Sequence, residues 1–571
     1  MSGSVSTDKV VLNILIEGED PRYDVFNVYI PRDITFGDLE DAIRATYEGK
    51  RYEPLGPLTL FKFNRPGEDY VGVTRKMMLD KLDKVDSASG WPAGSRIDDY
   101  MIHIVARIKV PRVVPSDQDD LRALQERNEE QANYLQSLEK YTSSQAAAPE
   151  TFQRLQGWED KYINVGRPHT GPSIVLHHPV FGRFLERLES SEPIPATICA
   201  QTIEYLTISQ QVYENEAERE KLTREVLGSL LGDDFGLSSA VDDQPDGTTT
   251  GRGGASCILM EVKNEIEDAD CDPSIHVAQT YARWWKDKSL LAQCCCPSIL
   301  IAIVGPWMCI LGAVYLERPT VQPLTDFMWI AYNPINPFGS DRIARAFHCA
   351  RLARDELEVF YKNPPDLKDN LQRYFPYITH YTDPTGHRVD FKYKSNLAPV
   401  VYLAQTCQDP PRLIVVKFVE RYNSEAHKLL AEAKLAPELL YDGTAYPNDQ
   451  PGPIHTMIVM EYINAIDLAR YDKPRAPDFV RTSVDKAIGL LHAHDFVFGD
   501  LRNQNVMLLQ DADEVVTGAM LIDFDWCGKD SVARYPFNMN PKIWWPDGIG
   551  PGKYMKKCCD DELRKYLSLD P

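Results

Sequence analysis

The sequence is short of positive charge. Its 62 lysines and arginines stand against 84 aspartates and glutamates, which gives a formal net charge of −22 at pH 7. A charge of this size keeps a protein soluble and repels nucleic acid at long range. Any contact with DNA or RNA would therefore need a local basic groove.

The start of the chain, MSGSVSTDK, lacks the apolar core of a secretory signal. The 12 cysteines lack regular spacing: Cys294, Cys295 and Cys296 form one run, and no CxxC pair or His partner stands at the spacing of a zinc site. We therefore expect buried thiols in a reducing, intracellular compartment, either the cytoplasm or the nucleus. Secretion without a signal peptide stays open as an alternative.

Unbroken hydrophobic runs of membrane-spanning length are lacking as well. The most apolar stretch, residues 298–316, reads SILIAIVGPWMCILGAVYL, and Gly305-Pro306 divides it into two halves rich in β-branched residues. This pattern predicts two buried strands joined by a turn. We expect no contact with a membrane.

What is present is an ordinary globular composition, with 43% hydrophobic and 26% charged residues over 571 positions. One core cannot serve so long a chain, so we expect a multidomain fold of α+β and α/β type. Residues 1–112 carry four strand patterns around the helix pattern FGDLEDAIRATY, which Thr35 and Asp38 would cap. This order predicts a β-grasp, ubiquitin-like head, with another small α+β domain as the alternative.

Residues 113–150 are predicted as a solvated helical linker that ends in a hinge at SSQAAAP. Residues 151–364 are predicted as a middle α/β domain. Its expected elements are one helical stretch over 197–231, strand CILMEVK, a helix over 273–286, the two apolar strands and a helix over 341–363. The sequence NPPD marks the end of this domain.

Residues 365–571 carry the parts that phosphoryl transfer requires: a cation for the phosphates, a base near the acceptor hydroxyl and oxygen ligands for magnesium. Strand LIVVKF places Lys417 as the phosphate-contacting lysine. The helix pattern NSEAHKLLAEAKL supplies Glu425, or else Glu432, to pair with that lysine. Strand TMIVMEYI would end at a hinge that meets adenine, formed by Met460, Glu461 and Tyr462.

The segment LLHAHDFVFGDLRNQNVML places Asp500 and Asn505 five residues apart, the spacing of the catalytic Asp and the metal-binding Asn in kinase catalytic loops. Arg502 would contact the γ-phosphate. Asp523, in the pattern MLIDFDW, would chelate magnesium through its carboxylate. His492 is predicted as a packing residue near this loop. The order of these motifs predicts binding of ATP and magnesium.

The middle domain carries a second pattern. Asp246 is followed on an apolar strand by Glu261 and Lys263, which is the PD…ExK order of restriction-endonuclease-like folds. There, two carboxylates hold magnesium and the lysine orients the attacking water. Gln279 and Glu218 would complete this nuclease-like group of side chains. The alternative is that Glu261 and Lys263 merely end an exposed strand and that Asp246 is a turn residue.

The motifs GDLRNQN and LIDFDW resemble the kinase-like domains of many mushroom-type fungal proteins and, more distantly, aminoglycoside and choline phosphotransferases. The region before Lys417 lacks a GxGxxG loop, Asp525 stands where protein kinases carry Gly, and no APE-like segment follows. The order of head, LMEVKNE segment and kinase-like tail resembles fungal crinkler-type proteins, without the LFLAK-type head signature of oomycetes. That resemblance implies nuclease-like or kinase-like toxin domains that act inside cells, often in nuclei.

The sequence thus favours a crinkler-like intracellular protein of toxin or effector type, whose kinase-like phosphotransferase domain uses ATP and magnesium, with a protein as a candidate acceptor. The ubiquitin-like head would bind protein partners, and the nuclease-like middle domain would bind DNA or RNA. Two alternatives stay open. One is a magnesium-dependent endonuclease that the kinase-like domain regulates. The other is a non-catalytic scaffold with degenerate enzyme folds.

Overall fold

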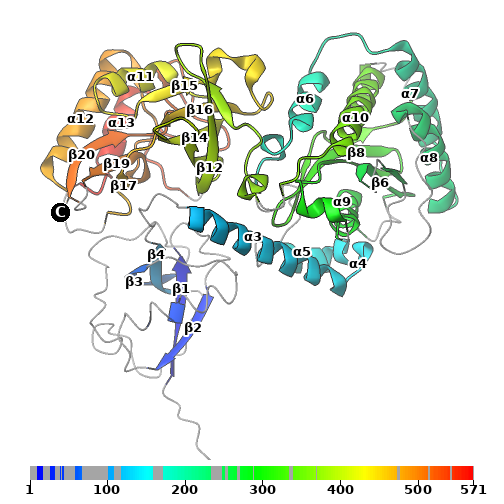
Figure 1. Cartoon of the computed structure of the whole chain (residues 1–571), viewed down its shortest axis with the longest axis horizontal. Helices are drawn as coiled ribbons and strands as arrows, with labels where there is room; N and C mark the ends of the chain where they lie inside the picture. The colour runs from blue at the N-terminus through cyan, green and yellow to red at the C-terminus, as the bar shows by residue number, and fades with distance from the viewer. Residues whose placement is uncertain are drawn as a thin grey trace, which may run out of the picture. The chain divides into compact units, whose positions relative to one another are not determined.

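The chain is described from a computed structural model (Figure 1). It falls into two compact units, each built from separate stretches of the chain. The first unit comprises residues 1–114, 421–442 and 460–571, and the second comprises residues 115–420 and 443–459. The residues that the structure describes are 9–16, 26–31, 39, 42–43, 58–66, 101–108, 117–157, 171–232, 247–250, 255–266, 271–286, 288–332, 338–367, 370–471, 476–511, 515–540 and 543–569.

In the first unit, the four strands expected in the head form one mixed sheet in the order β2-β1-β4-β3. The first two strands pair antiparallel, and the last strand runs parallel beside the first, as a β-grasp fold requires. Leu39 and Ile43 are helical and fully buried, whereas Thr35 and Asp38 lie outside the described residues. The ubiquitin-like identity of the head stays a prediction. The strands are β1 (Lys9–Ile16), β2 (Phe26–Pro31), β3 (Leu58–Pro66) and β4 (Met101–Ile108).

Helix α12 (Asp478–Ala493) lies in the core of the rest of the first unit. It buries one face at helical spacing through Val480, Val484 and Leu491, and it packs on β20, β18 and α11. Burial of each such side chain stabilises the fold by about 1.5–3 kcal/mol. The other elements are α11 (Ser424–Glu432), β15 (Leu439–Asp442), β17 (Ala465–Asp467), β18 (Phe496–Val497), β19 (Val506–Gln510), β20 (Val516–Leu521), β21 (Gly528–Lys529) and α13 (Lys557–Arg564). The sheets have the orders β17-β19-β20 and β18-β21.

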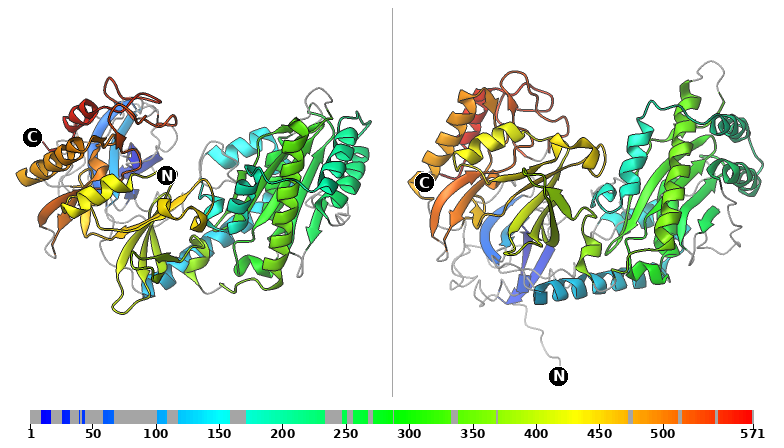
Figure 2. Two further views of the ribbon diagram at one scale, coloured as in Figure 1. Left: turned by 90° about the horizontal axis from the view of Figure 1, so that it is seen from above. Right: turned by 45° about the horizontal axis from the view of Figure 1, so that its top comes forward.

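In the second unit, the middle domain is a mixed sheet in the order β10-β8-β7-β6-β5, and helices α9 and α10 both pack on β6 and β7. Figure 2 shows α10 lying along the strands of this sheet. Strands β6 and β7 run parallel, and α9 forms the crossover between them. The strands are β5 (Gly247–Thr250), β6 (Ser256–Lys263), β7 (Ser298–Val304), β8 (Trp307–Tyr315), β9 (Pro319–Pro323) and β10 (Met328–Trp329). The helices are α6 (Pro179–Leu188), α7 (Ala196–Ser209), α8 (Glu216–Leu231), α9 (Pro273–Trp284) and α10 (Phe338–Lys362).

Two sequence predictions in this domain are confirmed, and one is wrong. Residues 298–316 form two buried antiparallel strands joined by a tight turn at Gly305, which has a φ of 51°. The cysteines are free thiols, and most of them are buried. The helical stretch over 197–231 is two helices instead of one, because the chain leaves α7 at Ser209 and the side chain of Asn215 caps a new helix, α8.

The predicted linker also differs from expectation. Helix α3 (Asp117–Ser137) is not solvated on all sides: it buries Leu124 and Tyr134, and Asp120 pairs with Lys394 at 2.7 Å. The expected hinge is helix α4 (Ser143–Ala147), because Thr142 and Gln145 form a capping box that satisfies the first backbone N–H groups. Helix α5 (Pro149–Gly157) follows. These helices belong to the body of the second unit.

A second sheet completes this unit, with β11, β12, β13, β14 and β16 as successive neighbours. It packs closely on the middle domain. The contact at Gly182 in α6 leaves no room for a side chain, since a Cβ there would collide with the backbone carbonyl of Pro451. The strands are β11 (His380–Thr382), β12 (Arg388–Ala398), β13 (Val401–Thr406), β14 (Leu413–Val419) and β16 (Thr456–Glu461). Among the described helices of the chain, none combines the length and the apolar character needed to cross a bilayer.

Candidate functional site

The hairpin of β19 and β20 brings two predicted magnesium ligands to one end of the first unit. Val506 pairs with Leu521, and the next backbone contact runs from Ile522 N to Asn505 O at 3.1 Å. Asn505 therefore stands at the start of one strand, and Asp523 stands just past the end of the other. Residues that are 18 positions apart in sequence meet because antiparallel pairing fixes their register.

Asp500 lies beside this end and is held by two partners. Its carboxylate is only 4% exposed and accepts two hydrogen bonds from Arg502, from Nε to Oδ1 at 2.5 Å and from Nη2 to Oδ2 at 2.6 Å. Asn505 Nδ2 donates to Oδ2 at 3.0 Å and to the Asp500 backbone carbonyl at 2.8 Å. Such a two-pronged Arg–carboxylate contact fixes geometry as well as charge.

Burial raises the pKa of the Asp500 carboxyl, and the negative charge of Asp523 raises it further, while Arg502 and Asn505 lower it. Asp523 thus lies close enough for its charge to act on Asp500. Its backbone is left-handed, with a φ of 75°, a conformation that non-glycine residues adopt mainly at turns and functional sites.

The residue after Asp523 anchors the loop in the core. Phe524 is fully buried, stacks on His427 of α11 with ring centroids 4.7 Å apart, and meets the edge of Phe498. Its backbone carbonyl accepts a hydrogen bond from Asn423 N at 3.2 Å. Phe524 contacts His427 of α11 and Phe498 of the Asp500 loop, so the position of the neighbouring Asp523 is fixed from two sides.

Asp560 on α13 is a site residue that the sequence reasoning missed. Its carboxylate is fully buried and accepts hydrogen bonds from the backbone N–H groups of Phe498 and Gly499, each at 2.8 Å, and lies 3.0 Å from His492 Nε2. It braces the two residues that precede Asp500. The segment CCDDELR contains two adjacent aspartates, and only the fold distinguishes buried Asp560 from exposed Asp561.

The residues expected to hold the nucleotide divide between the two units. Lys417, in the second unit, lies on β14 opposite Val401, beside the turn that joins β12 and β13. Glu425, in the first unit, is 76% exposed and lies 4.0 Å from Lys529. The proposed pairing of Lys417 with Glu425 therefore stays a prediction.

The expected adenine hinge lies in the first unit. Glu461 donates its backbone N–H to Glu438 O at 3.0 Å, and its side chain accepts from Glu438 N at 2.8 Å. This reciprocal pair fixes the end of β16. Met460 is buried, and Tyr462 follows the strand half-buried. The adenine role of these three residues is not tested by the fold and stays a prediction.

A cavity of about 980 Å³ lies next to the Asp500 loop. Trp545 lines it and lies against the guanidinium of Arg502, whose Cζ is 5.4 Å from the ring centroid. Its lining also includes exposed aromatic rings, among them Trp544 and Tyr566, which meet edge to face at 4.8 Å. Trp545 and Arg502 thus connect the cavity to the carboxylate of Asp500.

The middle domain brings part of its predicted set together. Glu261 is 1% exposed, accepts a hydrogen bond from Thr280 at 2.6 Å and lies 3.4 Å from His276 Nδ1. Burial lowers the pKa of His276 to about 3, with help from the charges of Lys263 and Arg283. Lys263 instead donates to Glu216 at 2.9 Å.

The remaining members of that set do not join Glu261. Gln279 accepts from Arg283 at 2.8 Å, and Glu218 stands in the first turn of α8, where Asn215 caps its backbone N–H. Asp246 lies outside the described residues. Across the part of the chain that the structure describes, no group of three or more His, Cys, Asp or Glu side chains is arranged to hold a metal ion.

The first-unit residues nevertheless offer the oxygen donors that magnesium prefers. Asn505 directs its amide nitrogen at Asp500, which turns its oxygen away from that carboxylate, and the Asp523 carboxylate follows on the neighbouring strand. These two side chains fit a magnesium ion of the kind that bridges nucleotide phosphates.

Comparison with known proteins gives little. No protein-family model matches the chain, and no curated protein matches it. Among solved structures, vaccinia related kinase 3 is similar at 14% sequence identity and a TM-score of 0.23, over 34% of this chain and 66% of that kinase. The chain thus spans just under two thirds of the length of that kinase. This is a weak and distant likeness to a protein kinase.

Proposed function

We propose that residues 365–571 form a kinase-like phosphotransferase that binds ATP with magnesium. The observation that carries the proposal is the convergence of Asp500, Asn505 and Asp523 at one end of the β19–β20 hairpin, with Asp500 buried and held in place. Phosphoryl transfer relies on positioning and electrostatics, so a rigid base beside oxygen ligands is its central requirement.

Each residue has a role in this proposal. Asp500 orients the acceptor hydroxyl and takes its proton, and its raised pKa suits a general base better than an ordinary carboxylate would. Magnesium, when bound by Asn505 and Asp523, would neutralise charge on the phosphates. Lys417 would contact the phosphates with Glu425 as its partner, and the adenine would meet the hinge of Met460, Glu461 and Tyr462.

Arg502 has a double role. In the structure it occupies both oxygens of Asp500, so an acceptor hydroxyl can reach that carboxylate only after the guanidinium turns aside. The γ-phosphate is the anion that would draw it away. Nucleotide binding would in this way uncover the base only when a phosphate is ready for transfer.

The acceptor would enter the cavity beside Trp545. Aromatic side chains line that cavity. Its lining also includes two lysines, Lys553 and Lys556, and two acidic residues, Asp547 and Glu562. A polypeptide side chain or a small polar molecule would fit a volume of this size.

Binding of the nucleotide provides the first test. The intact chain should melt at a higher temperature when ATP and magnesium are added together, because a ligand that binds only the folded state stabilises it by mass action. Asp523→Ala should abolish this shift, whereas Asp561→Ala, which removes an exposed carboxylate of α13, should keep it. An unchanged melting temperature of the intact chain with ATP and magnesium would refute the proposal.

The same proposal extends to the domain organisation of the whole chain. A ubiquitin-like head over 1–112, a helical linker over 113–150, a nuclease-like domain over 151–364 and the kinase-like domain over 365–571 would together make a crinkler-like protein of toxin or effector type that acts inside cells. The mixed sheet of the head supports the first part, since its parallel pairing of β1 with β4 suits a β-grasp fold.

A magnesium-dependent nuclease is the second candidate function. It is favoured by one observation: buried Glu261 and half-buried Lys263 lie at the end of strand β6 beside α9, and His276 of that helix faces Glu261. With Asp246, these residues would hold magnesium and orient a water. Cleavage of DNA or RNA should then be lost in Lys263→Ala and retained in Asp500→Ala. A chain that shows neither cleavage nor nucleotide binding would instead be a non-catalytic scaffold.

A further inference from the structure

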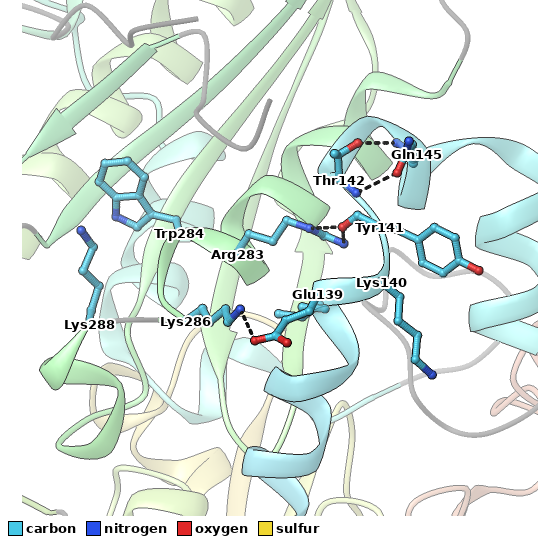
Figure 3. Close-up of a pocket in the computed structure, with 10 residues that line it drawn as sticks. Glu139, Lys140, Tyr141, Thr142, Gln145, Arg283, Trp284, Lys286 and Lys288 are labelled. Carbon is cyan, nitrogen blue, oxygen red and sulfur yellow. Dashed lines mark hydrogen bonds and ion pairs between the residues drawn. The ribbon is translucent and has the colours of Figure 1, made fainter. Parts of the chain in front are cut away.

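A basic pocket lies in the second unit, between the chain that follows α3 and the end of α9 (Figure 3). Its volume is about 480 Å³. The residues that matter here are Glu139, Lys140, Arg283, Trp284, Lys286 and Lys288. Four cationic residues and one carboxylate thus line the pocket, in a chain whose overall charge is −22. A concentration of positive charge against that background creates a local field that attracts anions. Asp287, between two of these lysines, lies outside the described residues.

Arg283 contributes a fixed charge. Its guanidinium donates to the backbone carbonyl of Tyr141 at 3.1 and 2.8 Å, and to the backbone and side chain of Gln279 at 3.1 and 2.8 Å. These four contacts hold the guanidinium in place at the wall of the pocket. Figure 3 shows this side chain at the centre of the pocket, pointing to the chain at Tyr141.

The lysines contribute charges that can be redirected. Lys286 lies 2.9 Å from Glu139, whose side chain is 63% exposed, and so exposed an ion pair is weak because solvent screens it. Lys288 holds its ammonium 4.7 Å from the centroid of the Trp284 ring and forms no ion pair with any described residue. Both ammonium groups can therefore turn to a stronger anion at little cost.

Trp284 adds an unsatisfied donor. Its Nε1 is buried and has no hydrogen-bond partner among the described residues. A buried N–H without an acceptor is unfavourable, and a ligand oxygen at this place would supply the acceptor. The indole also offers a flat apolar surface beside the cations.

We propose that this pocket binds the phosphate group of a nucleotide, either free or within a single nucleic-acid strand. Lysines act as point charges for phosphate, and an indole supplies both a donor for a phosphate oxygen and a surface for a base. The volume suits a ligand of nucleotide size. Arg283 also lowers the pKa of His276, which faces Glu261, so the pocket lies within electrostatic reach of the second candidate site. Binding here needs neither cleavage nor the kinase-like domain.

The test is equilibrium binding to the full chain. The probes are a fluorescein-labelled single-stranded oligonucleotide of about 12 nucleotides, with thymidine monophosphate and inorganic pyrophosphate as competitors. Lys286→Ala/Lys288→Ala should weaken oligonucleotide binding by about tenfold or more. It should also reduce the slope of log K against log salt concentration by about 2. The matched control is Lys221→Ala/Lys362→Ala, which removes two exposed lysines from α8 and α10 and should leave both quantities unchanged.

Two further variants sharpen the outcome. Trp284→Phe should weaken binding without changing the salt slope, since it removes only the N–H donor, and Asp523→Ala should bind the probe as the parent chain does. Displacement by thymidine monophosphate would identify a free nucleotide phosphate as the ligand, and failure to displace would identify the strand. The proposal is overturned if the parent chain binds neither the oligonucleotide nor thymidine monophosphate at low salt. It is also overturned if the lysine pair and its control behave alike.

Discussion

At the scale of single residues, the proposed phosphoryl transfer rests on Asp500 and on the groups that contact its carboxylate. The sequence spacing identified Asp500, Arg502 and Asn505 as members of one loop. It did not indicate that the guanidinium of Arg502 donates to both oxygens of that carboxylate, with contacts of 2.5 and 2.6 Å. That contact follows from the burial of the loop, where a carboxylate without a charged partner would be costly.

The pH dependence of phosphoryl transfer should report this contact. Burial raises the pKa of Asp500, whereas Arg502 lowers it. Arg502→Ala removes a lowering effect, so the pKa should rise and the loss of activity on acidification should begin at a higher pH than in the parent chain. The measurement is the rate of ATP turnover across pH, compared by shape and not by amplitude. Arg470→Ala, at an exposed arginine of the same unit, should leave the profile in place. An acid limb that does not move in Arg502→Ala would contradict the assignment.

At the scale of elements, the catalytic loop is held by a helix from the far end of the chain. The N-terminal turn of α13 supplies Asp560, whose carboxylate takes two backbone N–H groups immediately before Asp500. Gly499 fits this arrangement, since its φ is 82° and a side chain there would collide with Met555. The strand β18, which leads into the loop, is fixed from its other side by pairing with β21.

Asp560→Asn should loosen the loop. The amide keeps one acceptor and replaces the other with a donor that faces N–H groups, so about 2–3 kcal/mol of unfolding free energy should be lost. Chemical denaturation of the full chain, followed by tryptophan fluorescence of the first unit, measures this loss. Asp561→Asn changes the adjacent exposed carboxylate and should cost less than about 0.5 kcal/mol. Equal stability of the two variants would show that Asp560 does not brace the loop.

The elements also show where local sequence patterns mislead. The polar composition of α3 suggested a solvated helix, yet Leu124 and Tyr134 are buried and Asp120 pairs with Lys394 from a distant strand. The small and polar residues SSQAAAP suggested a hinge, yet a capping box starts α4 there, and Ala146 and Ala147 are buried. In both cases a partner from far along the sequence covers surface that looks exposed when only its neighbours are considered.

At the scale of the whole molecule, residues 365–571 contribute stretches to both compact units. Strands β12, β13 and β14 belong to the same compact unit as the middle domain, whereas the catalytic loop belongs to the other unit. Close contacts inside the second unit support this division. Tyr377 donates its backbone N–H to Leu176 at 2.8 Å, and Gly182 of α6 packs directly on Pro451 and Gly452.

Gly182→Ala should therefore destabilise the second unit as a whole. Its Cβ would collide with the backbone carbonyl of Pro451, which cannot move as a flexible side chain could, and we expect a loss of about 1–3 kcal/mol. The measurement is the melting temperature of the full chain together with limited proteolysis near residue 451. Gly339→Ala, at an exposed position of α10 with open space around it, is the control and should be neutral or mildly stabilising. No difference between the two variants would argue that the middle domain and the β12–β16 sheet fold independently.

The sequence by itself determined those features that depend on neighbours along the chain. These include the strand pair at 298–316, the helices around Pro273 and Asp341, and the spacing of Asp500, Asn505 and Asp523. Local periodicity and motif spacing carry that information because each is a property of a short segment. Only the tertiary structure decided which carboxylate braces the catalytic loop, what covers α3, and where four cations gather in an acidic chain. Those features join segments that are tens to hundreds of residues apart. Packing between such segments does not produce a periodic pattern in the sequence of either segment.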